Sequence, residues 1–356
     1  MKAAGLLLAM GALACSRAPA GDREEPASSI SAPARNQEPS LAPPSAALRS
    51  AAPQTSAAPA KAPPDISPIE RSLELAAIVS IAPRAGSALG VFDATVRLET
   101  HTVPARLTLA LTDEPQALRR PLAFYKLARA LGAHVVPVSV LRREGAGSIA
   151  ELLEKQPDLL LALKPRLAIQ NDGTVDALLT TVGPIDAPWS APQGSPIAVN
   201  GSAEIDALAR RASSAIPLPG ERPQLLRDFV EMIALDYLSA NVLRRTAVLD
   251  AAAGALVLDD NATAFPLHVD PRAEARLLNL LRSSARFPKN LRSALEAFDR
   301  SRAVSTLAPG SFEGWLISPR SLVALDERRV SLLSLLDAKI AAAGSPSSGD
   351  AAVLSL

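Results

Sequence analysis

Apolar and polar residues alternate through the first half of the folded region, which is the pattern of β-strands with one buried face. Two segments have helical spacing instead of alternation. The first of them has a proline in its first turn and a glycine after its last turn, which mark the two ends of a helix. The expected strands span residues 91–98, 106–112, 135–141 and 175–182, and the expected helices span residues 121–131 and 145–163. A turn of small residues precedes the first of these strands.

The pattern changes to helical periodicity in the second half of the chain. A proline-rich, irregular stretch at residues 184–200 separates the halves. The elements expected after it are helices at residues 203–215 and 223–240, a short hairpin made of residues 247–250 and 255–258, and helix over nearly all of residues 272–343. A strand-rich half followed by a helix-rich half predicts an α+β protein of two lobes with a cleft between them.

The N-terminus has the three regions of a bacterial export signal, namely Lys2, an apolar run at residues 3–14, and small residues before Cys15. The run is too short to span a bilayer. Small residues directly before a cysteine resemble the lipobox, which implies that Cys15 is lipidated and becomes the mature N-terminus. Ser16 is compatible with sorting to the outer membrane. The sequence therefore predicts an exported lipoprotein of the cell envelope, and an ordinary cleaved signal with an incidental cysteine is the alternative.

Residues 16–65 are dominated by alanine, proline and serine and contain few large apolar side chains. Such a segment cannot bury enough apolar surface to offset the loss of chain entropy, so a disordered tether is expected. The complete division that we predict is a signal peptide with a lipobox at residues 1–15, a tether at 16–65, a strand-rich lobe at 66–183, an irregular linker at 184–202, a helical lobe at 203–345 and a tail at 346–356.

Composition argues against several classes of function. The net charge is +1 and only 3% of residues are aromatic, so we do not expect binding to nucleic acid. His101, His134 and His268 lie far apart and lack the spacing of metal ligands. Cys15 is the only cysteine, which argues against an internal disulfide and a thiol nucleophile, and no Gly-x-Ser-x-Gly elbow is present.

Two strands joined by a glycine turn, then a helix, a hinge and a helical lobe with a polar loop form the order of parts in a kinase fold. Residues 121–127 (Pro-Leu-Ala-Phe-Tyr-Lys-Leu) and 131–137 (Leu-Gly-Ala-His-Val-Val-Pro) resemble a helix and its exit in one branch of this fold. That branch is the atypical kinases, which include the Golgi secretory-pathway casein kinase, HipA-like proteins and the phosphoinositide-kinase-like group. The resemblance covers roughly residues 78–355 and implies a two-lobe kinase-like fold, with ATP and Mg²⁺ or Mn²⁺ as its cofactors.

In the first lobe, the resemblance assigns Gly86 and Gly90 to the loop that covers nucleotide phosphates, because glycine lets backbone amides approach an anion closely. An ordinary hairpin turn would have the same glycines. The next strand should carry a phosphate-pairing lysine, but residues 107–112 contain none, and Lys164 lies on the wrong side of the helix. Pro121 stands where the resemblance expects the glutamate that orients this lysine. Both members of that ion pair are therefore missing together.

In the second lobe, the run from Asp236 to Asn241 resembles the approach to the catalytic aspartate of the atypical kinases. Where Asn-x-Asp-Arg is expected, this chain has Asn-Val-Leu-Arg, so Leu243 occupies the base position. A leucine can neither accept a hydroxyl proton nor orient a nucleophile. Asn241 and Arg244 match the pattern and are candidate cofactor-binding residues. Asp236 is a candidate displaced acid, and a structural role for it on the preceding helix is the alternative.

Asp260 ends a β-prone run, and the sequence from Asp260 to Phe265 resembles the Asp-Asn-Gly-x-x-Phe segment that supplies a metal-holding carboxylate. The resemblance makes Asp260 and Asn261 the candidate metal ligands, because carboxylate oxygens bind Mg²⁺ or Mn²⁺ together with phosphate oxygens. Asp259 beside them is a second candidate acid. An acidic pair at the exit of a hairpin, without any ligand, fits the sequence equally well.

Three functions are open at this point. The first is an exported, lipid-anchored pseudokinase that binds an unknown protein partner and keeps at most residual nucleotide or metal binding. The second is an active atypical kinase that uses Asp236 or Asp259 as a displaced acid. The third is a structural lipoprotein of the cell envelope. The first two depend on residue 243 lying in a loop and not in the interior of a helix.

Overall fold

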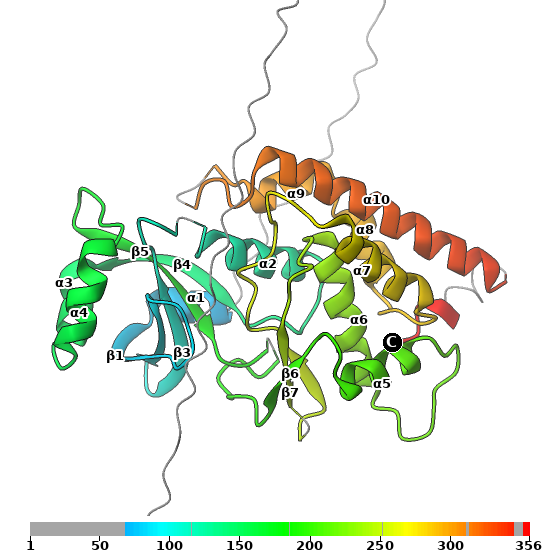
Figure 1. Cartoon of the computed structure of the whole chain (residues 1–356), viewed down its shortest axis with the longest axis horizontal. Coiled ribbons are helices and arrows are strands. Elements are labelled where there is room, and N and C mark those ends of the chain that lie inside the picture. The colour runs from blue at the N-terminus through cyan, green and yellow to red at the C-terminus, as the bar shows by residue number, and fades with distance from the viewer. Residues whose placement is uncertain (1–67, 115, 185, 251, 311–312, 345–351) are drawn as a thin grey trace, which may run out of the picture. The chain divides into compact units, whose positions relative to one another are not determined.

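A computed structural model of the chain describes residues 68–114, 116–184, 186–250, 252–310, 313–344 and 352–356. These residues form a five-stranded sheet, a three-stranded sheet and ten α-helices (Figure 1). The expected signal peptide with Cys15, the tether at residues 16–65 and residues 346–351 of the expected tail lie outside the described residues. No helix of the described part is long and apolar enough to cross a membrane.

The larger sheet contains the strands of the first half. They are β1 (Ala77–Pro83), β2 (Val91–Arg97), β3 (Thr102–Leu109), β4 (Ser139–Gly145) and β5 (Thr174–Thr181). The order is β1-β2-β3-β5-β4, and every neighbouring pair is antiparallel. Alternation places one face of each strand in the core, as in β3, where Val103, Ala105, Leu107 and Leu109 are buried.

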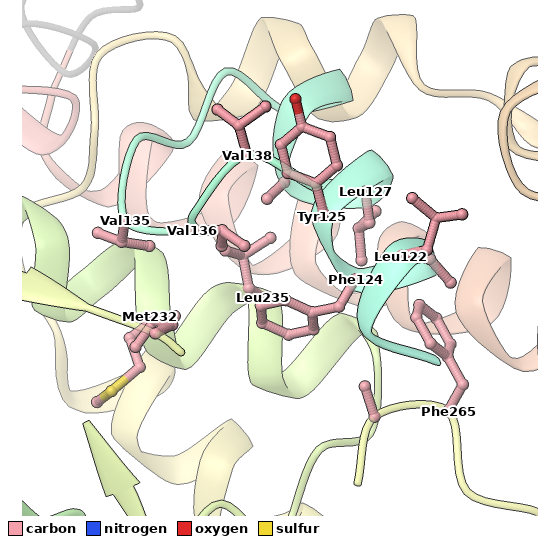
Figure 2. Close-up of a cluster of buried hydrophobic side chains, with 14 of the residues drawn as sticks. Leu122, Phe124, Tyr125, Leu127, Val135, Val136, Val138, Met232, Leu235 and Phe265 are labelled. Carbon is pink, nitrogen blue, oxygen red and sulfur yellow. The ribbon is translucent and has the colours of Figure 1, made fainter. Parts of the chain in front are cut away.

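Two strands differ from their predicted bounds. β3 begins at Thr102 and not at residue 106, so it includes Pro104, a residue that is uncommon within strands. β4 begins four residues later than predicted, because Val135, Val136 and Val138 fill the core beside α2 and do not enter the sheet (Figure 2). An apolar run alone does not distinguish a strand from a buried connection.

The helices of the first half are α1 (Pro68–Leu75), α2 (Arg119–Ala130), α3 (Ala146–Leu152) and α4 (Pro157–Leu163), followed by the 3₁₀ turn η1 (Lys164–Arg166). α2 is the helix predicted at residues 121–131, and Gly132 follows it with a φ of 68°. The single helix predicted at residues 145–163 is divided in two. Pro157 has no N–H to continue α3 and instead begins α4.

The second half is mainly helical, as predicted. Its helices are α5 (Ala203–Ala212), α6 (Pro223–Leu238), α7 (Pro271–Ser283), α8 (Leu291–Ala297), α9 (Arg300–Leu307) and α10 (Pro319–Ala342). The smaller sheet is β6 (Ser195–Ala198), β7 (Thr246–Asp250) and β8 (Ala255–Val257). The predicted hairpin is present as β7 and β8, and β6 lies in the stretch that was expected to be irregular.

α6 is the central helix of this half, because nearly every side chain from Leu226 to Leu238 is buried. It contacts α5, α7, α10 and β8, and α2 of the first half packs beside it. Figure 2 shows this junction, where Leu235 and Met232 of α6 lie among apolar side chains of α2 and of the connection to β4. Burial of so many apolar side chains in one place fixes the position of both ends of α6.

Candidate functional site

The turn that follows α6 carries Leu243 at its exposed tip. Ala240 has a φ of 52°, which is a left-handed conformation that turns the chain away from the helix axis. Residues 241–244 then form a turn before β7 begins at Thr246. The Leu243 side chain is 60% exposed, so residue 243 lies in a loop and not in a helix.

Arg244, from the same turn, is buried and makes contacts in three directions. Its guanidinium donates to both carboxylate oxygens of Asp236 on α6, with Nε–Oδ2 2.7 Å and Nη2–Oδ1 2.8 Å. Nη1 donates to the backbone carbonyl of Asp260 at 2.9 Å. The guanidinium carbon lies 5.2 Å from the centroid of the Phe124 ring on α2. Arg244 thus connects α6, α2 and the segment after β8.

Asn241 and Asn261 complete this buried network. Asn241 donates to Asp236 Oδ1 at 3.1 Å and accepts a hydrogen bond from the Thr263 hydroxyl. Asn261 accepts from Arg244 at 2.8 Å and donates to the carbonyl of Leu258 at 2.9 Å. Both amides therefore use their donor and acceptor groups within the protein.

Asp236 lies in the interior of this network, and its side chain is only 2% exposed. Burial raises the pKa of Asp236, and the ion pair with Arg244 opposes this effect. Because every oxygen of the carboxylate already accepts a hydrogen bond, the geometry favours the structural interpretation of Asp236 over that of a displaced acid.

Asp259 lies after β8 and pairs with Arg106 of the larger sheet and with Arg84 of the turn after β1. Arg106 on β3 donates to the Asp259 carboxylate at 3.0 Å and to its backbone carbonyl at 2.8 Å. Arg84, which follows β1, donates to the same carboxylate oxygen at 3.2 Å. Burial lowers the pKa of Arg106, and the negative charge of Asp259 opposes this effect.

The glycine turn begins at Arg84. Gly86 and Gly90 have φ values of 73° and 88°, a conformation that glycine adopts without strain. Gly90 is buried, and a Cβ there would lie 3.3 Å from the side chain of Leu111. Gly86 is exposed, with no atom within 4 Å of such a Cβ. The turn is therefore linked through Arg84 to Asp259, while the glycines themselves serve its backbone conformation.

Arg106 is the site residue that sequence reasoning missed. A cation on this strand was sought only in residues 107–112, one position after Arg106. The sequence signal for Arg106 is a charged residue in the middle of a mainly apolar strand. In the structure, β3 pairs Arg106 with Asp93 of β2. Lys164, in contrast, is exposed in η1.

The two predicted metal ligands, Asp260 and Asn261, have different surroundings. The Asp260 carboxylate is exposed and accepts one 3.4 Å hydrogen bond, from the backbone N–H of Ala262. Asn261 faces inward, and the Asp259 carboxylate is occupied by two guanidinium groups. Among the described residues, no group of three or more histidine, cysteine or acidic side chains is arranged to hold a metal ion. Mg²⁺ is commonly bound through one or two carboxylates together with phosphate oxygens and water, so Asp260 stays a candidate ligand.

Comparison with solved structures identifies the fold. The Golgi casein kinase with Mn and ADP bound has a TM-score of 0.51 to this chain at 14% sequence identity, over 76% of this chain and 75% of the kinase chain. The chain has an atypical kinase-like fold. This confirms the fold that the sequence resemblance implied, with a β-sheet lobe at residues 77–181 and a helical lobe after it.

Two further structures match at lower scores. A hydra Fam20 protein solved with sugar has a TM-score of 0.48 at 15% identity, over 77% of this chain and 88% of its own chain. The proinflammatory kinase CtkA of Helicobacter pylori has a TM-score of 0.34 at 11% identity, over 72% and 92% of the two chains. No protein-family model matches the sequence, and no curated protein sequence matches it significantly.

Proposed function

We propose that this protein is a pseudokinase, which keeps the kinase-like fold, transfers no phosphoryl group and acts by binding a protein partner. The observation that carries the proposal is the exposed leucine in the turn after α6. Leu243 stands at the position of the general base, in a loop where a substrate could reach it. Its aliphatic side chain supplies no acid–base chemistry, and loss of a general base typically reduces a rate by about 10² to 10⁴.

The surrounding charges support the same proposal. Asp259 is neutralised by Arg84 and Arg106, and Arg244 binds Asp236 in the core. These groups are used to hold the sheet, the turn after α6 and the segment after β8 together. Phosphoryl transfer needs the cation, the clamp and the base to act as a unit, so the loss of several parts is more severe than the loss of one.

We place the protein in the bacterial cell envelope, on the outer membrane, anchored by a lipid on Cys15. The support is the N-terminal sequence, with its charged residue, apolar run and small residues before the cysteine. A tether at residues 16–65 would let the kinase-like part meet a partner at some distance from the membrane. Mass spectrometry of the mature N-terminal peptide tests this: a diacylglyceryl or triacylated Cys15 supports it, and an unmodified cysteine or cleavage elsewhere contradicts it.

Residual nucleotide binding is a second candidate function, favoured by one observation. The Nε atom of Arg106 is buried and has no hydrogen-bond partner in the described part of the chain. An unsatisfied buried donor is costly, and a phosphate oxygen would satisfy it. The Golgi casein kinase, which shares the fold, was solved with Mn and ADP bound.

Two measurements test these functions. The first is transfer of labelled phosphate from ATP, with Mg²⁺ or Mn²⁺, to a mixed-sequence peptide library and to the protein itself. We expect no incorporation above a no-protein blank, and sustained turnover would overturn the pseudokinase proposal. Loss of that turnover in Asp236→Asn, at a temperature where thermal unfolding shows this variant to be folded, would assign the chemistry to a displaced acid.

The second measurement is the shift of the thermal unfolding midpoint with ATP or ADP, each with and without Mn²⁺. A shift that is lost in Arg106→Ala supports nucleotide binding. Loss in Asp260→Ala, but not in Asp158→Ala, would assign a role to the exposed carboxylate of Asp260. Asp158 is an exposed acid on α4 and serves as the matched control. No shift in any condition removes the second candidate function.

A further inference from the structure

The connection between α5 and α6 projects from the helical part of the protein as a loop (Figure 1). Its apolar tip, residues 215–220, reads Ala-Ile-Pro-Leu-Pro-Gly, and every one of these residues is exposed. Ile216 is 69% exposed and Leu218 is 37% exposed. Single exposed apolar residues are common on protein surfaces, but two aliphatic residues and two prolines in one short tip indicate a contact surface.

A buried ion pair holds the loop in place below the apolar tip. Arg286, in the segment after α7, pairs with Glu221, directly after the tip, and both side chains are 4% exposed. Arg286 donates to the two carboxylate oxygens of Glu221 at 2.8 Å and 2.6 Å, and to the carbonyl of Ser214 at 3.0 Å. One buried guanidinium therefore fixes the chain on both sides of the tip. A loop that is already held in one conformation loses little entropy when it binds.

The backbone groups of both aliphatic residues are hydrogen-bonded within the loop. The Ile216 N–H donates to the Ser214 hydroxyl oxygen at 3.4 Å, and this hydroxyl donates to the Ile216 carbonyl at 2.7 Å. The Leu218 N–H donates to the Glu221 carboxylate at 3.2 Å, and the Leu218 carbonyl accepts from the Glu221 N–H at 3.0 Å. The prolines after each of them have no N–H. Both aliphatic residues can therefore leave water while their own backbone groups stay paired.

Positive charge flanks the apolar tip. Arg210 lies in the last turn of α5, is exposed and forms no ion pair with the described residues, and Arg222 lies directly before α6. Glu221 is the only acid among residues 207–227, and its charge is balanced by Arg286. Cations at both ends of an apolar projection attract an anionic surface.

We infer that the apolar tip inserts into the surface of an anionic phospholipid membrane, with its aliphatic side chains below the headgroups and the flanking arginines at the level of the phosphates. Aliphatic side chains gain from leaving water, while arginine keeps its charged end at the interface. A membrane fits this feature better than a pocket of a partner protein, because a lipid surface accepts a projection with cations at both ends without a matching cavity. The inference goes beyond the proposed pseudokinase function and does not depend on the lipid proposed at Cys15.

Fluorescence quenching tests the insertion in the full chain. Ile216→Trp places a fluorophore at the tip, and lipids brominated on their acyl chains quench only fluorophores that contact them. We expect quenching in vesicles of equal parts phosphatidylcholine and phosphatidylglycerol, after subtraction of the wild-type signal from Trp189 and Trp315. Leu75→Trp is the control, because Leu75 is 77% exposed but lies beside Glu74, and it should show no quenching above the wild type.

Two further substitutions in the Ile216→Trp chain separate the apolar and the charged contributions. Leu218→Ser should lower the ratio of inserted to withdrawn tip by about fivefold or more. Arg210→Gln should lower this ratio by about fivefold in the anionic vesicles and leave it unchanged in phosphatidylcholine alone. Arg97→Gln, at an exposed position of β2, is the charge control and should have no effect. Because these positions are exposed, all of the variants should keep the thermal unfolding midpoint of the wild type.

Several outcomes would overturn the inference. One is the absence of quenching in Ile216→Trp, and another is equal quenching in Leu75→Trp, which would mean that the chain meets the vesicle without using the tip. Insertion that Arg210→Gln leaves unchanged, or that is as strong in phosphatidylcholine alone, would also refute it. A dimer in light scattering that Leu218→Ser dissociates assigns the tip to a second copy of this chain. All variants share one N-terminus, so a lipid on Cys15, or its absence, affects them alike, and the phosphate-transfer assay tests the pseudokinase proposal separately.

Discussion

Arg106 on β3 donates hydrogen bonds to both the backbone carbonyl and the carboxylate of Asp259, at 2.8 Å and 3.0 Å. The two residues are 153 positions apart in the sequence, and each side chain is 15% exposed. This contact joins the larger sheet to the segment after β8. The Asp259 carboxylate is therefore bound to a cation of the protein itself.

Replacement of Arg106 should loosen this junction. We expect Arg106→Ala to lower the free energy of unfolding by about 1 to 3 kcal/mol, because it removes charge-assisted hydrogen bonds from a largely buried acid. Hydrogen exchange should also become faster in residues 84–90 and 259–263. Arg97→Ala, at an exposed position near the end of β2, is the control and should change stability by less than about 0.5 kcal/mol. Similar effects of the two substitutions would contradict a role for the Arg106–Asp259 contact.

The Arg244–Asp236 ion pair makes a stronger prediction, because both side chains are 2% exposed. Asp236→Ala leaves a buried arginine unpaired and should lower the free energy of unfolding by about 3 to 5 kcal/mol. The double variant Asp236→Leu, Arg244→Met removes both charges and should be less destabilised than the sum of its single variants. Urea unfolding measures all of these. A fully stable Asp236→Ala protein would show that Asp236 does not hold the network together.

Leu243→Asp tests whether an acid at position 243 is enough to give the proposed pseudokinase phosphoryl transfer. We expect no phosphoryl transfer in this variant, because Asp259 remains paired with two arginines and Asn261 remains bound to Arg244. Its stability should change by less than about 0.5 kcal/mol, since Leu243 is 60% exposed. Leu161→Asp, at a position 76% exposed on α4, is the control for the added charge. Turnover that Leu243→Asp gains and Leu161→Asp lacks would mean that the remaining site is intact.

The elements that the sequence predicts well are those whose signals are local. α2 begins with a proline in its first turn and is followed by a glycine, and the hairpin of β7 and β8 is a short apolar repeat around a turn. β4 is less well predicted, because the valines at 135, 136 and 138 have the composition of a strand but lie in a connection that packs against α2. The apolar composition predicts that these valines are buried, but it does not show that they pack against α2 and not within the sheet.

In the candidate site, too, the features set by neighbouring residues are predictable, and the contacts between residues far apart in the sequence are not. The exposed turn at Leu243 follows from its place after a helix, and the structure has it there. The contacts of Arg106 and Arg84 with Asp259 could not be predicted, because the acid and the arginines lie more than 150 residues apart. The inward orientation of Asn241 and Asn261 depends likewise on Arg244, which reaches both segments only in the folded chain.

Asp228 provides a prediction about pH. Its side chain on α6 is buried, accepts hydrogen bonds from Gln224 Nε2 and from the Leu256 N–H of β8, and lies near Glu231. Burial raises the pKa of Asp228 to about 7 from 3.8, while the Leu256 hydrogen bond opposes the rise. The folded protein therefore keeps a proton on this acid at pH values where the unfolded chain has released it.

The sign of the effect follows from this difference. Below pH 3.8 both states are protonated at Asp228, and as pH rises from there to about 7 the unfolded state is increasingly favoured. Between pH 5 and 8 this acid alone should reduce the free energy of unfolding by roughly 2 to 3 kcal/mol. Glu231 has a raised pKa for the same reason, burial, so it adds a slope of the same direction.

Asp228→Asn isolates the contribution of the one acid. The amide keeps the size of the side chain and can still accept from Leu256 N–H, so it stands in for the protonated acid, and the variant should already be more stable than the wild type by about 1 to 2 kcal/mol at pH 5. At pH 8 the advantage should grow by roughly 2 to 3 kcal/mol, to about 4 kcal/mol, because the variant has no buried acid to ionise at this position. Urea unfolding at pH 5 and pH 8 measures the difference, with Asp158→Asn on α4 as the exposed control that should follow the wild type. Parallel pH dependence of wild type and Asp228→Asn would show that Asp228 ionises in the folded protein as readily as in the unfolded chain.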